Sequence, residues 1–288
     1  MTQVKVRLPD AMETSLIMLE GLALDARSEP TILGDRLALQ AFQKVDYDFS
    51  RLRTRLASPN STRIKVAARA KHFDIWTEQF LAAHDRATVL NLGAGLDPRV
   101  WRVDPGPGVR WYDVDLPGVV DARRQLFPER ENYQLVAASV TDEEWLDRIP
   151  DDLPVLVIAQ GLTMYLHPAD GHRLFGRITD RFPSGTVVLD THNWLGVRTV
   201  NRVMKRKLGA PLLHWAIDDP RELERANPAL RCVESVSSVS PALLDELPAG
   251  ATPRGSKPAA AVSMLIPPVR DLSLMVRYEF GPAGTSSR

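Results

Sequence analysis

From residue 88 to residue 190 the sequence alternates short apolar runs with longer segments in which apolar residues recur at helical spacing. The apolar runs predict five strands, at 88–92, 109–115, 133–138, 155–159 and 185–190. The segments between them predict helices at 118–127, 142–148 and 168–182. Strands that alternate with helices in this way favour a parallel sheet with helices on both faces, so this feature indicates the α/β class.

Both flanks of the alternating region have helical patterns. We expect mainly helix over 11–85, and helix again over 191–228 with breaks at Pro211 and Pro220. After these come a sixth strand, a short helix and a seventh strand, predicted at 231–238, 259–266 and 272–280. The expected organisation is a helical N-terminal cap, an α/β domain, a helical substrate-lid insertion after the fifth strand and a flexible tail, at 1–84, 85–280, 191–228 and 281–288.

The composition excludes several classes of protein. With 288 residues, no net charge and 44% hydrophobic residues, the chain has enough apolar material for a sizeable core and no basic excess for a nucleic-acid partner. The basic stretch 198–207 is expected to be a solvated helix face. Without a signal-peptide pattern or an apolar run of about 18 residues, the chain is expected to be cytoplasmic and not to bind or cross a membrane. Cys232 is the only cysteine, and no histidine–carboxylate spacing indicates a metal site.

A glycine-rich turn follows the first predicted strand directly. Gly93, Ala94 and Gly95 stand where the backbone of an α/β protein approaches a bound nucleotide or nucleoside. A dinucleotide fingerprint would have a third glycine three residues after Gly95, but this chain has Pro98 there. The turn therefore favours a nucleoside without phosphates, and it argues against a nicotinamide-dependent dehydrogenase.

Two carboxylates end the second predicted strand. Asp113 and Asp115 lie about 20 residues after the glycines, where an acidic side chain is placed to accept hydrogen bonds from both ribose hydroxyls. Since side chains alternate along a strand, both point to the same side, and either one is a candidate ribose ligand.

Motifs spread over nearly the whole chain resemble those of one family. They are Glu13-Thr14-Ser15-Leu16, Asp35-Arg36-Leu37-Ala38, Asp46-Tyr47-Asp48-Phe49, Arg69-Ala70-Lys71-His72-Phe73-Asp74, Asn91-Leu92-Gly93-Ala94-Gly95-Leu96-Asp97-Pro98-Arg99, Asp113-Val114-Asp115-Leu116-Pro117 and Ala159-Gln160-Gly161-Leu162-Thr163-Met164-Tyr165-Leu166. In this order they resemble the leucine carboxyl methyltransferase superfamily, especially its bacterial branch, the tetracenomycin-type polyketide O-methyltransferases. The resemblance implies a class I methyltransferase fold, Rossmann-like with seven mostly parallel strands, and S-adenosylmethionine as the cofactor.

The resemblance also implies roles for particular residues. Arg69 would bind the carboxylate of the cofactor, for which a guanidinium fork with two charge-assisted hydrogen bonds is well suited. Asp115, with Asp113 as second choice, would bind the ribose. The remaining expected cofactor contacts are those of the glycine turn with the methionine part and ribose, of the loop after the third strand with the adenine, and of the fourth strand's end with the ammonium: Gly93, Ala94, Gly95, Ser139, Val140 and Gln160.

Two of these positions depart from the pattern of the family. Many relatives have Asp where Ser139 stands, and a serine reaches less far toward the adenine amino group, so Asp142 is a candidate substitute. Many relatives have Glu where Gln160 stands near the ammonium of the cofactor. A glutamine still accepts a hydrogen bond through its amide oxygen, but it loses the charge pairing, so we expect weaker cofactor binding than in a relative with Glu.

The chemistry of the acceptor decides whether a base is needed. A carboxylate, with a pKa of about 4, is ionised at neutral pH, whereas a phenol, with a pKa of about 10, benefits from a general base. His192, after the fifth strand, is the first candidate base, and Tyr165 is a candidate for hydrogen bonding to substrate or cofactor. Candidate walls of an apolar acceptor pocket come from the N-terminal helix and the insertion: Met12, Leu16, Met18, Leu19, Trp194, Leu212, Leu213 and Trp215.

The prediction is therefore an S-adenosylmethionine-dependent O-methyltransferase acting on a carboxylate or phenolic oxygen. A small, partly apolar metabolite such as a polyketide-like acid is favoured over a protein C-terminus as the acceptor. The alternative is a catalytically silent relative that binds the cofactor, for which Ser139 and Gln160 are the support. The sequence does not indicate an oligomeric state.

Overall fold

A seven-stranded sheet forms the centre of the protein in a computed structural model, which describes residues 13–51, 58–208, 211–253 and 255–282. The strands are β1 (Ala87–Leu92), β2 (Val109–Asp115), β3 (Tyr133–Ala137), β4 (Val155–Ala159), β5 (Gly185–His192), β6 (Arg231–Ser237) and β7 (Ser273–Phe280). Their order in the sheet is β3-β2-β1-β4-β5-β7-β6, and only β7 runs antiparallel to its neighbours. All seven predicted strands are confirmed within two residues at each end, and so is the α/β class.

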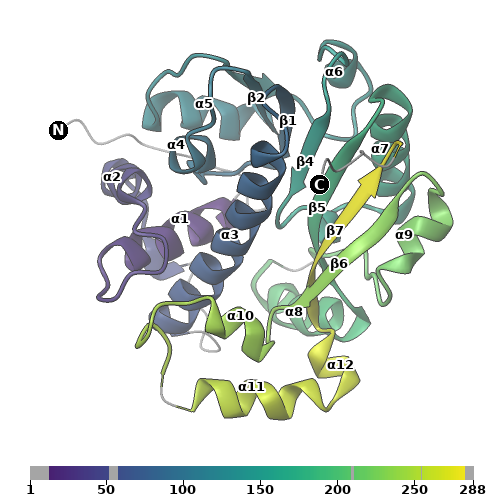
Figure 1. The fold of residues 1–288 in the computed structure, drawn as a ribbon. Coiled ribbons are helices and arrows are strands. Elements are labelled where there is room, and N and C mark those ends of the chain that lie inside the picture. The colour runs from purple at the N-terminus through teal and green to yellow at the C-terminus, as the bar shows by residue number, and fades with distance from the viewer. Residues whose placement is uncertain (1–12, 52–57, 209–210, 254, 283–288) are drawn as a thin grey trace.

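Helices cover both faces of the sheet (Figure 1). One face packs against α3 (Pro59–Ala82), α4 (Arg99–Val103) and α5 (Pro117–Leu126). The other face packs against α6 (Glu144–Asp147), α7 (Pro168–Arg181) and α9 (Arg221–Ala226). The sheet order reverses between β1 and β4, and ligands of open α/β sheets bind at the carboxyl ends of the strands beside such a reversal.

The N-terminal helices pack beside α3. They are α1 (Glu13–Ala26), α2 (Arg36–Lys44) and the short 3₁₀ helix η2 (Phe49–Arg51). The fully buried carboxylate of Asp25 holds the turn between α1 and α2, because it accepts the backbone N–H groups of Ile32, Leu33 and Gly34 and pairs with Arg63 of α3. This carboxylate replaces the backbone partners that the turn lacks, and it ties the turn to α3.

The region after β5 is only partly helical. Helix α8 (Trp194–Leu208) begins it, and Arg198, Arg202 and Lys205 are exposed, as expected of a solvated basic face. The residues 211–217, for which helix was expected, form an irregular segment without helix or strand. Asn201 explains this difference, because its side chain accepts from the backbone of 212 and 213 and donates to the carbonyl of Leu213, supplying the bonds that a helix would supply.

Four further short elements complete the described part of the fold. They are η3 (Thr163–Tyr165), α10 (Pro241–Asp245), α11 (Ser256–Met264) and α12 (Pro267–Arg270). Helix α11 overlaps the helix predicted at 259–266, and residues 283–288 of the predicted tail lie outside the described residues. Within the described ranges, no helix combines the length and the apolar character that crossing a bilayer requires. In Figure 1, α10, α11 and α12 lie together below the sheet, near the start of α8.

Candidate functional site

The glycine turn after β1 adopts the backbone geometry that its residues favour. Gly93 and Gly95 have φ values of +62° and +55°, a region that side chains with a Cβ rarely adopt. Gly93 donates its N–H to the carbonyl of Val114 at 2.8 Å, which joins the turn to β2. A Cβ on Gly95 would lie 3.2 Å from the hydroxyl oxygen of Ser15, so the turn also lies directly beneath α1.

Asp113 has its hydrogen-bonding capacity committed to the protein. Its side chain is 1% exposed and accepts from Asn91, Trp111 and Tyr133, at 2.8, 2.9 and 2.7 Å, as well as from the buried guanidinium of Arg123. Arg123 in turn donates to the carbonyl of Gly95 at 2.7 Å. The geometry thus favours a structural role for Asp113, which supports the glycine turn from below.

Asp115 is better placed to meet a ligand. Its carboxylate is half-buried and accepts the N–H of Gly95 at 2.7 Å and that of Leu116 at 2.8 Å. Burial raises the pKa of Asp115, although the two backbone donors oppose that rise. A carboxylate has about four lone-pair positions, so two remain for the hydroxyls of a ribose.

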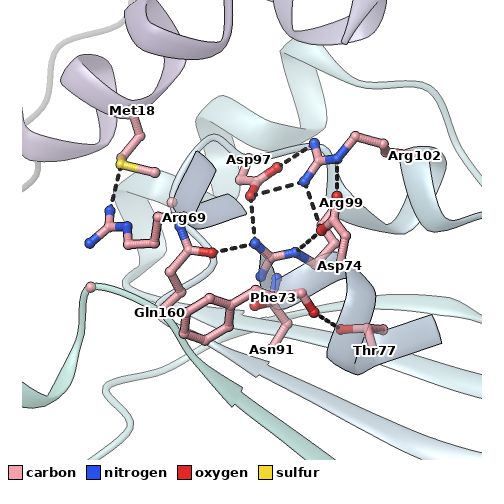
Figure 2. Close-up of polar contacts among 12 residues, drawn as sticks. Met18, Arg69, Phe73, Asp74, Thr77, Asn91, Asp97, Arg99, Arg102 and Gln160 are labelled. Carbon is pink, nitrogen blue, oxygen red and sulfur yellow. Dashed lines mark hydrogen bonds and ion pairs between the residues drawn. The ribbon is translucent and has the colours of Figure 1, made fainter. Parts of the chain in front are cut away.

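Arg69, in the middle of α3, reaches the carboxyl ends of the strands. Its Nη1 lies 2.7 Å from Oδ2 of Asp190 on β5, and its Nη2 lies 2.8 Å from the sulfur of Met18 on α1. Figure 2 shows the guanidinium extended toward Met18, close to Gln160. A quarter of the side chain is exposed, so the guanidinium keeps donors for an anionic ligand.

Gln160, directly after β4, belongs to a buried network of charged residues. Its amide oxygen accepts from Nη2 of Arg99, whose Nε donates to Asp74 at 2.8 Å (Figure 2). The second arginine of the network, Arg102, pairs with Asp97 of the glycine loop at 2.9 Å and with Asp74 at 2.6 Å. The network fixes the end of β4 relative to α3 and α4.

His192 and Tyr165, the candidate catalytic residues, come from β5 and η3. Strand alternation puts His192 on the same face of β5 as Asp190. Its Nδ1 lies 2.9 Å from the carbonyl of Thr191, and a proton on Nδ1 leaves the lone pair of Nε2 free to accept another. Burial raises the pKa of Tyr165, while a hydrogen bond with Thr14 of α1 opposes the rise, so the phenol is protonated at neutral pH and is a donor rather than a base.

The loop after β3 contains the two residues expected to meet the adenine. Val140 is buried, and its carbonyl accepts from Trp145. The hydroxyl of Ser139 lies 2.7 Å from that of Thr141, while the carboxylate of Asp142 accepts the backbone N–H of Ser139 at 3.2 Å. Asp142 therefore lies beside Ser139, as its suggested substitute role requires.

The structure thus brings most of the predicted residues to the carboxyl edge of β1, β2, β4 and β5. The candidate pocket walls behave differently from one another: Leu16, Leu19, Leu213 and Trp215 are buried in the packing, Trp194 is 52% exposed, and Met12 lies outside the described residues. Two open hollows, of about 850 and 790 Å³, lie instead beside the edge strands β6 and β3. No group of three or more metal-ligating side chains occurs in the described part of the chain.

Sequence reasoning gave no role to Asp190 and Arg99. Asp190 was visible only as a polar residue at the end of an apolar strand, a signal that marks the ligand-binding edge of an α/β sheet. Arg99 gave no such signal, because its partners, Asp74 and Gln160, come from elements distant in sequence.

Residues 16–179, more than half of the chain, match the family model described as leucine carboxyl methyltransferase. The chain belongs to this family. It is 39% identical to the tetracenomycin polyketide synthesis O-methyltransferase TcmP of Streptomyces glaucescens, over 96% of this chain and 98% of that protein. It is also 35% identical to the S-adenosyl-L-methionine-dependent methyltransferase dpfgK of Gibberella zeae, over 79% of this chain and 82% of that protein.

Solved structures support the fold assignment. A candidate methyltransferase from Thermobifida fusca superposes with a TM-score of 0.57 at 20% identity, over 96% of this chain and 100% of that one. A protein of the duf574 family from Streptomyces avermitilis gives a TM-score of 0.55 at 16% identity, over 85% and 90% of the two chains. The leucine carboxyl methyltransferase family member described here is therefore an enzyme with a class I methyltransferase fold.

Proposed function

We propose that this methyltransferase transfers the methyl group of S-adenosylmethionine to an oxygen of a small, partly apolar acceptor, either a carboxylate or a phenol. The observation that carries the proposal is the position of Arg69. Its partly exposed guanidinium lies at the carboxyl edge of the sheet, where Asp190 of β5 and Met18 of α1 hold it. A partly exposed cation at this edge suits the carboxylate of an amino-acid ligand.

The other residues present at this edge fit the cofactor. Asp115 would bind the ribose hydroxyls, and Gly93, Ala94 and Gly95 would let the methionine part pass close to the backbone. Ser139 and Val140 would meet the adenine. Gln160 would accept a hydrogen bond from the ammonium, although it shares its amide oxygen with Arg99.

The sulfonium of the cofactor activates the methyl group, so the protein mainly has to position the acceptor and exclude water. His192 would hold an acceptor hydroxyl through Nε2 and take its proton when the acceptor is a phenol. Tyr165, protonated at neutral pH, would donate a hydrogen bond to substrate or cofactor.

The finer organisation belongs to the same proposal. Residues 1–84 would cap the site, 85–280 would form the catalytic domain and 191–228 would close over the acceptor, with Trp194 exposed at its start. We propose a cytoplasmic location, in keeping with a metabolite substrate. The polyketide acceptor implied by the name of TcmP makes a polyketide-like acid the first class to test.

The test is methyl transfer from labelled S-adenosylmethionine to matched pairs of aromatic acceptors that carry either a carboxyl or a hydroxyl group on the same ring. We expect turnover of at least one member of a pair. If the acceptor is a phenol, His192→Gln lowers kcat by about 10²–10⁴-fold, whereas carboxylate turnover changes only a few-fold. Cofactor binding without transfer to any acceptor would contradict the proposal and favour a catalytically silent relative.

A further inference from the structure

The carboxylate of Asp190 connects two walls of the candidate site. It has no exposed surface, its Oδ2 lies 2.7 Å from Nη1 of Arg69, and its Oδ1 accepts the N–H of Gly161 at 2.5 Å. A buried carboxylate is tolerated where donors replace the water that it has lost. Arg69 of α3 and Gly161, in the turn after β4, supply those donors.

The pairing with Asp190 determines where the guanidinium of Arg69 lies. An arginine side chain has many rotamers, and it binds a carboxylate through two parallel hydrogen bonds only when its plane is correctly oriented. Here Nη1 contacts Asp190 and Nη2 contacts Met18, so both ends of the fork are fixed before any ligand arrives. Arg69 remains a quarter exposed, which leaves it accessible.

The second contact of Asp190 fixes the turn after β4. Gly161 has a φ of +69°, and a Cβ there would lie 3.7 Å from both terminal nitrogens of Arg69, so this turn packs against the guanidinium. The next residue, Leu162, lies 3.1 Å from the position of a Cβ on Gly93. One carboxylate thus sets the relative position of Arg69, the turn that carries Gln160, and the glycine turn beyond it.

We infer that Asp190 is a positioning residue for cofactor binding, which orients Arg69 toward the carboxylate of the cofactor without touching the cofactor itself. The inference rests on the proposed role of Arg69. Asp190 would then govern affinity for the amino-acid part of the cofactor and have little effect on affinity for its nucleoside part. A carboxylate that merely stabilises the fold would affect both parts equally.

The test compares two ligands in calorimetric titrations. S-adenosylhomocysteine carries the amino-acid part, and 5′-methylthioadenosine lacks it. In Asp190→Asn, one amide oxygen replaces two acceptor oxygens, so Arg69 or Gly161 loses its partner. We expect about tenfold weaker binding of S-adenosylhomocysteine and less than a twofold change for 5′-methylthioadenosine. In the Asp190→Asn background, Arg69→Ala should cost far less affinity than in the wild type, because the two residues act as one unit.

Asp190→Glu provides a second variant should the asparagine variant not fold. It keeps the charge but moves the carboxylate by one methylene, and we expect the same selective loss. The inference would be overturned if these variants bound both ligands equally less tightly than the wild type does, or if the ratio of the two affinities stayed as in the wild type. Tighter binding of S-adenosylhomocysteine by the variants would also overturn it. Failure of the wild type to bind S-adenosylhomocysteine would instead overturn the proposed function, so the two failures are distinguishable.

Discussion

Asp113 and Asp115 stand two residues apart on β2 but differ in their surroundings. Asp113 is buried with four donors, including Arg123, whereas Asp115 is half-buried with two backbone donors. Replacement of Asp113 by asparagine leaves a buried guanidinium without its charged partner, so we expect a loss of about 3 kcal/mol in the free energy of unfolding. Chemical denaturation of the variant measures this loss.

The matched variant Asp115→Asn should have the opposite profile. Its neutral side chain binds ribose hydroxyls less strongly, and we expect about tenfold weaker binding of S-adenosylhomocysteine, roughly 1.4 kcal/mol. The free energy of unfolding should change by about 1 kcal/mol or less, because an amide oxygen still accepts one backbone N–H. Both affinities are measured under conditions in which the two variants are fully folded. If Asp113→Asn then weakens the binding of S-adenosylhomocysteine as much as Asp115→Asn does, the result would argue against Asp115 as the ribose ligand.

Replacement of Gln160 by glutamate is predicted to increase the affinity for the cofactor. In Gln160→Glu the side-chain oxygen can still accept from Arg99, and the added charge pairs with the ammonium of the cofactor. We expect S-adenosylhomocysteine to bind about three- to tenfold more tightly, with the affinity for 5′-methylthioadenosine unchanged. Titrations with the two ligands check this, and a tighter complex with both of them would mean that the charge acts on the nucleoside part or on the fold.

At the residue scale, sequence reasoning is strongest where the chemistry is local. The positive φ values of Gly93 and Gly95 agree with the glycine turn predicted directly after the first strand, whereas the role of Asp115 as ribose ligand stays a prediction. The partners of Arg69 and Gln160 could not be predicted in this way. Asp190 is 121 residues from Arg69, and Arg99 is 61 residues from Gln160, so only the folded chain brings them together.

At the scale of elements, two glycines of α7 form a natural pair of variants. A Cβ on Gly171 would lie 1.9 Å from the indole of Trp215, whereas a Cβ on Gly176 would meet nothing within 4 Å. We expect Gly171→Ala to destabilise the protein by about 1–3 kcal/mol, because the 211–217 segment is pushed off α7. Gly176→Ala should stabilise it by up to about 1 kcal/mol through helix propensity.

Thermal denaturation of the two alanine variants measures both effects. If Gly171→Ala binds S-adenosylhomocysteine normally while it melts earlier, the packing of the 211–217 segment on α7 contributes to stability and not to cofactor binding. A variant as stable as the wild type would contradict the close packing of Trp215 on α7.

The sequence predicted long elements better than short ones. The strands and α7 have strong apolar patterns, and the structure matches them closely. Helices α4, α10 and α12 have only four or five residues, too few for a periodic pattern, and they were not predicted. The 211–217 segment was predicted to be helical because the contribution of Asn201 depends on a contact that the local sequence does not reveal.

At the scale of the whole molecule, the network around Arg102 links the N-terminal helices to the α/β domain. It contains Asp35 at the start of α2, Asp74 of α3 and Asp97 of the glycine loop. Burial works to raise the pKa of Asp97, but Arg102 and Arg99 outweigh it and hold that pKa at about 2. Burial raises the pKa of Asp35 in spite of Arg102.

These shifts predict how stability depends on pH. Because the pKa of Asp97 is lower in the folded chain than in the unfolded chain, Asp97 stabilises the fold above about pH 4, and this stabilisation is lost as the pH falls toward 2. It amounts to about 2 kcal/mol. The difference in unfolding free energy between the wild type and Asp97→Asn should therefore narrow by about that amount between pH 5 and pH 2. Denaturant titrations at several pH values measure it, and a constant difference would contradict the pKa of Asp97.

The central claim is that Arg69 binds the carboxylate of S-adenosylmethionine at the carboxyl edge of the sheet. The most direct measurement is calorimetric titration of S-adenosylmethionine and S-adenosylhomocysteine into the wild type and into Arg69→Ala. We predict micromolar binding to the wild type and at least about tenfold weaker binding to the variant, roughly 1.4 kcal/mol. Undetectable binding by the wild type, or equal binding by both proteins, would contradict the claim.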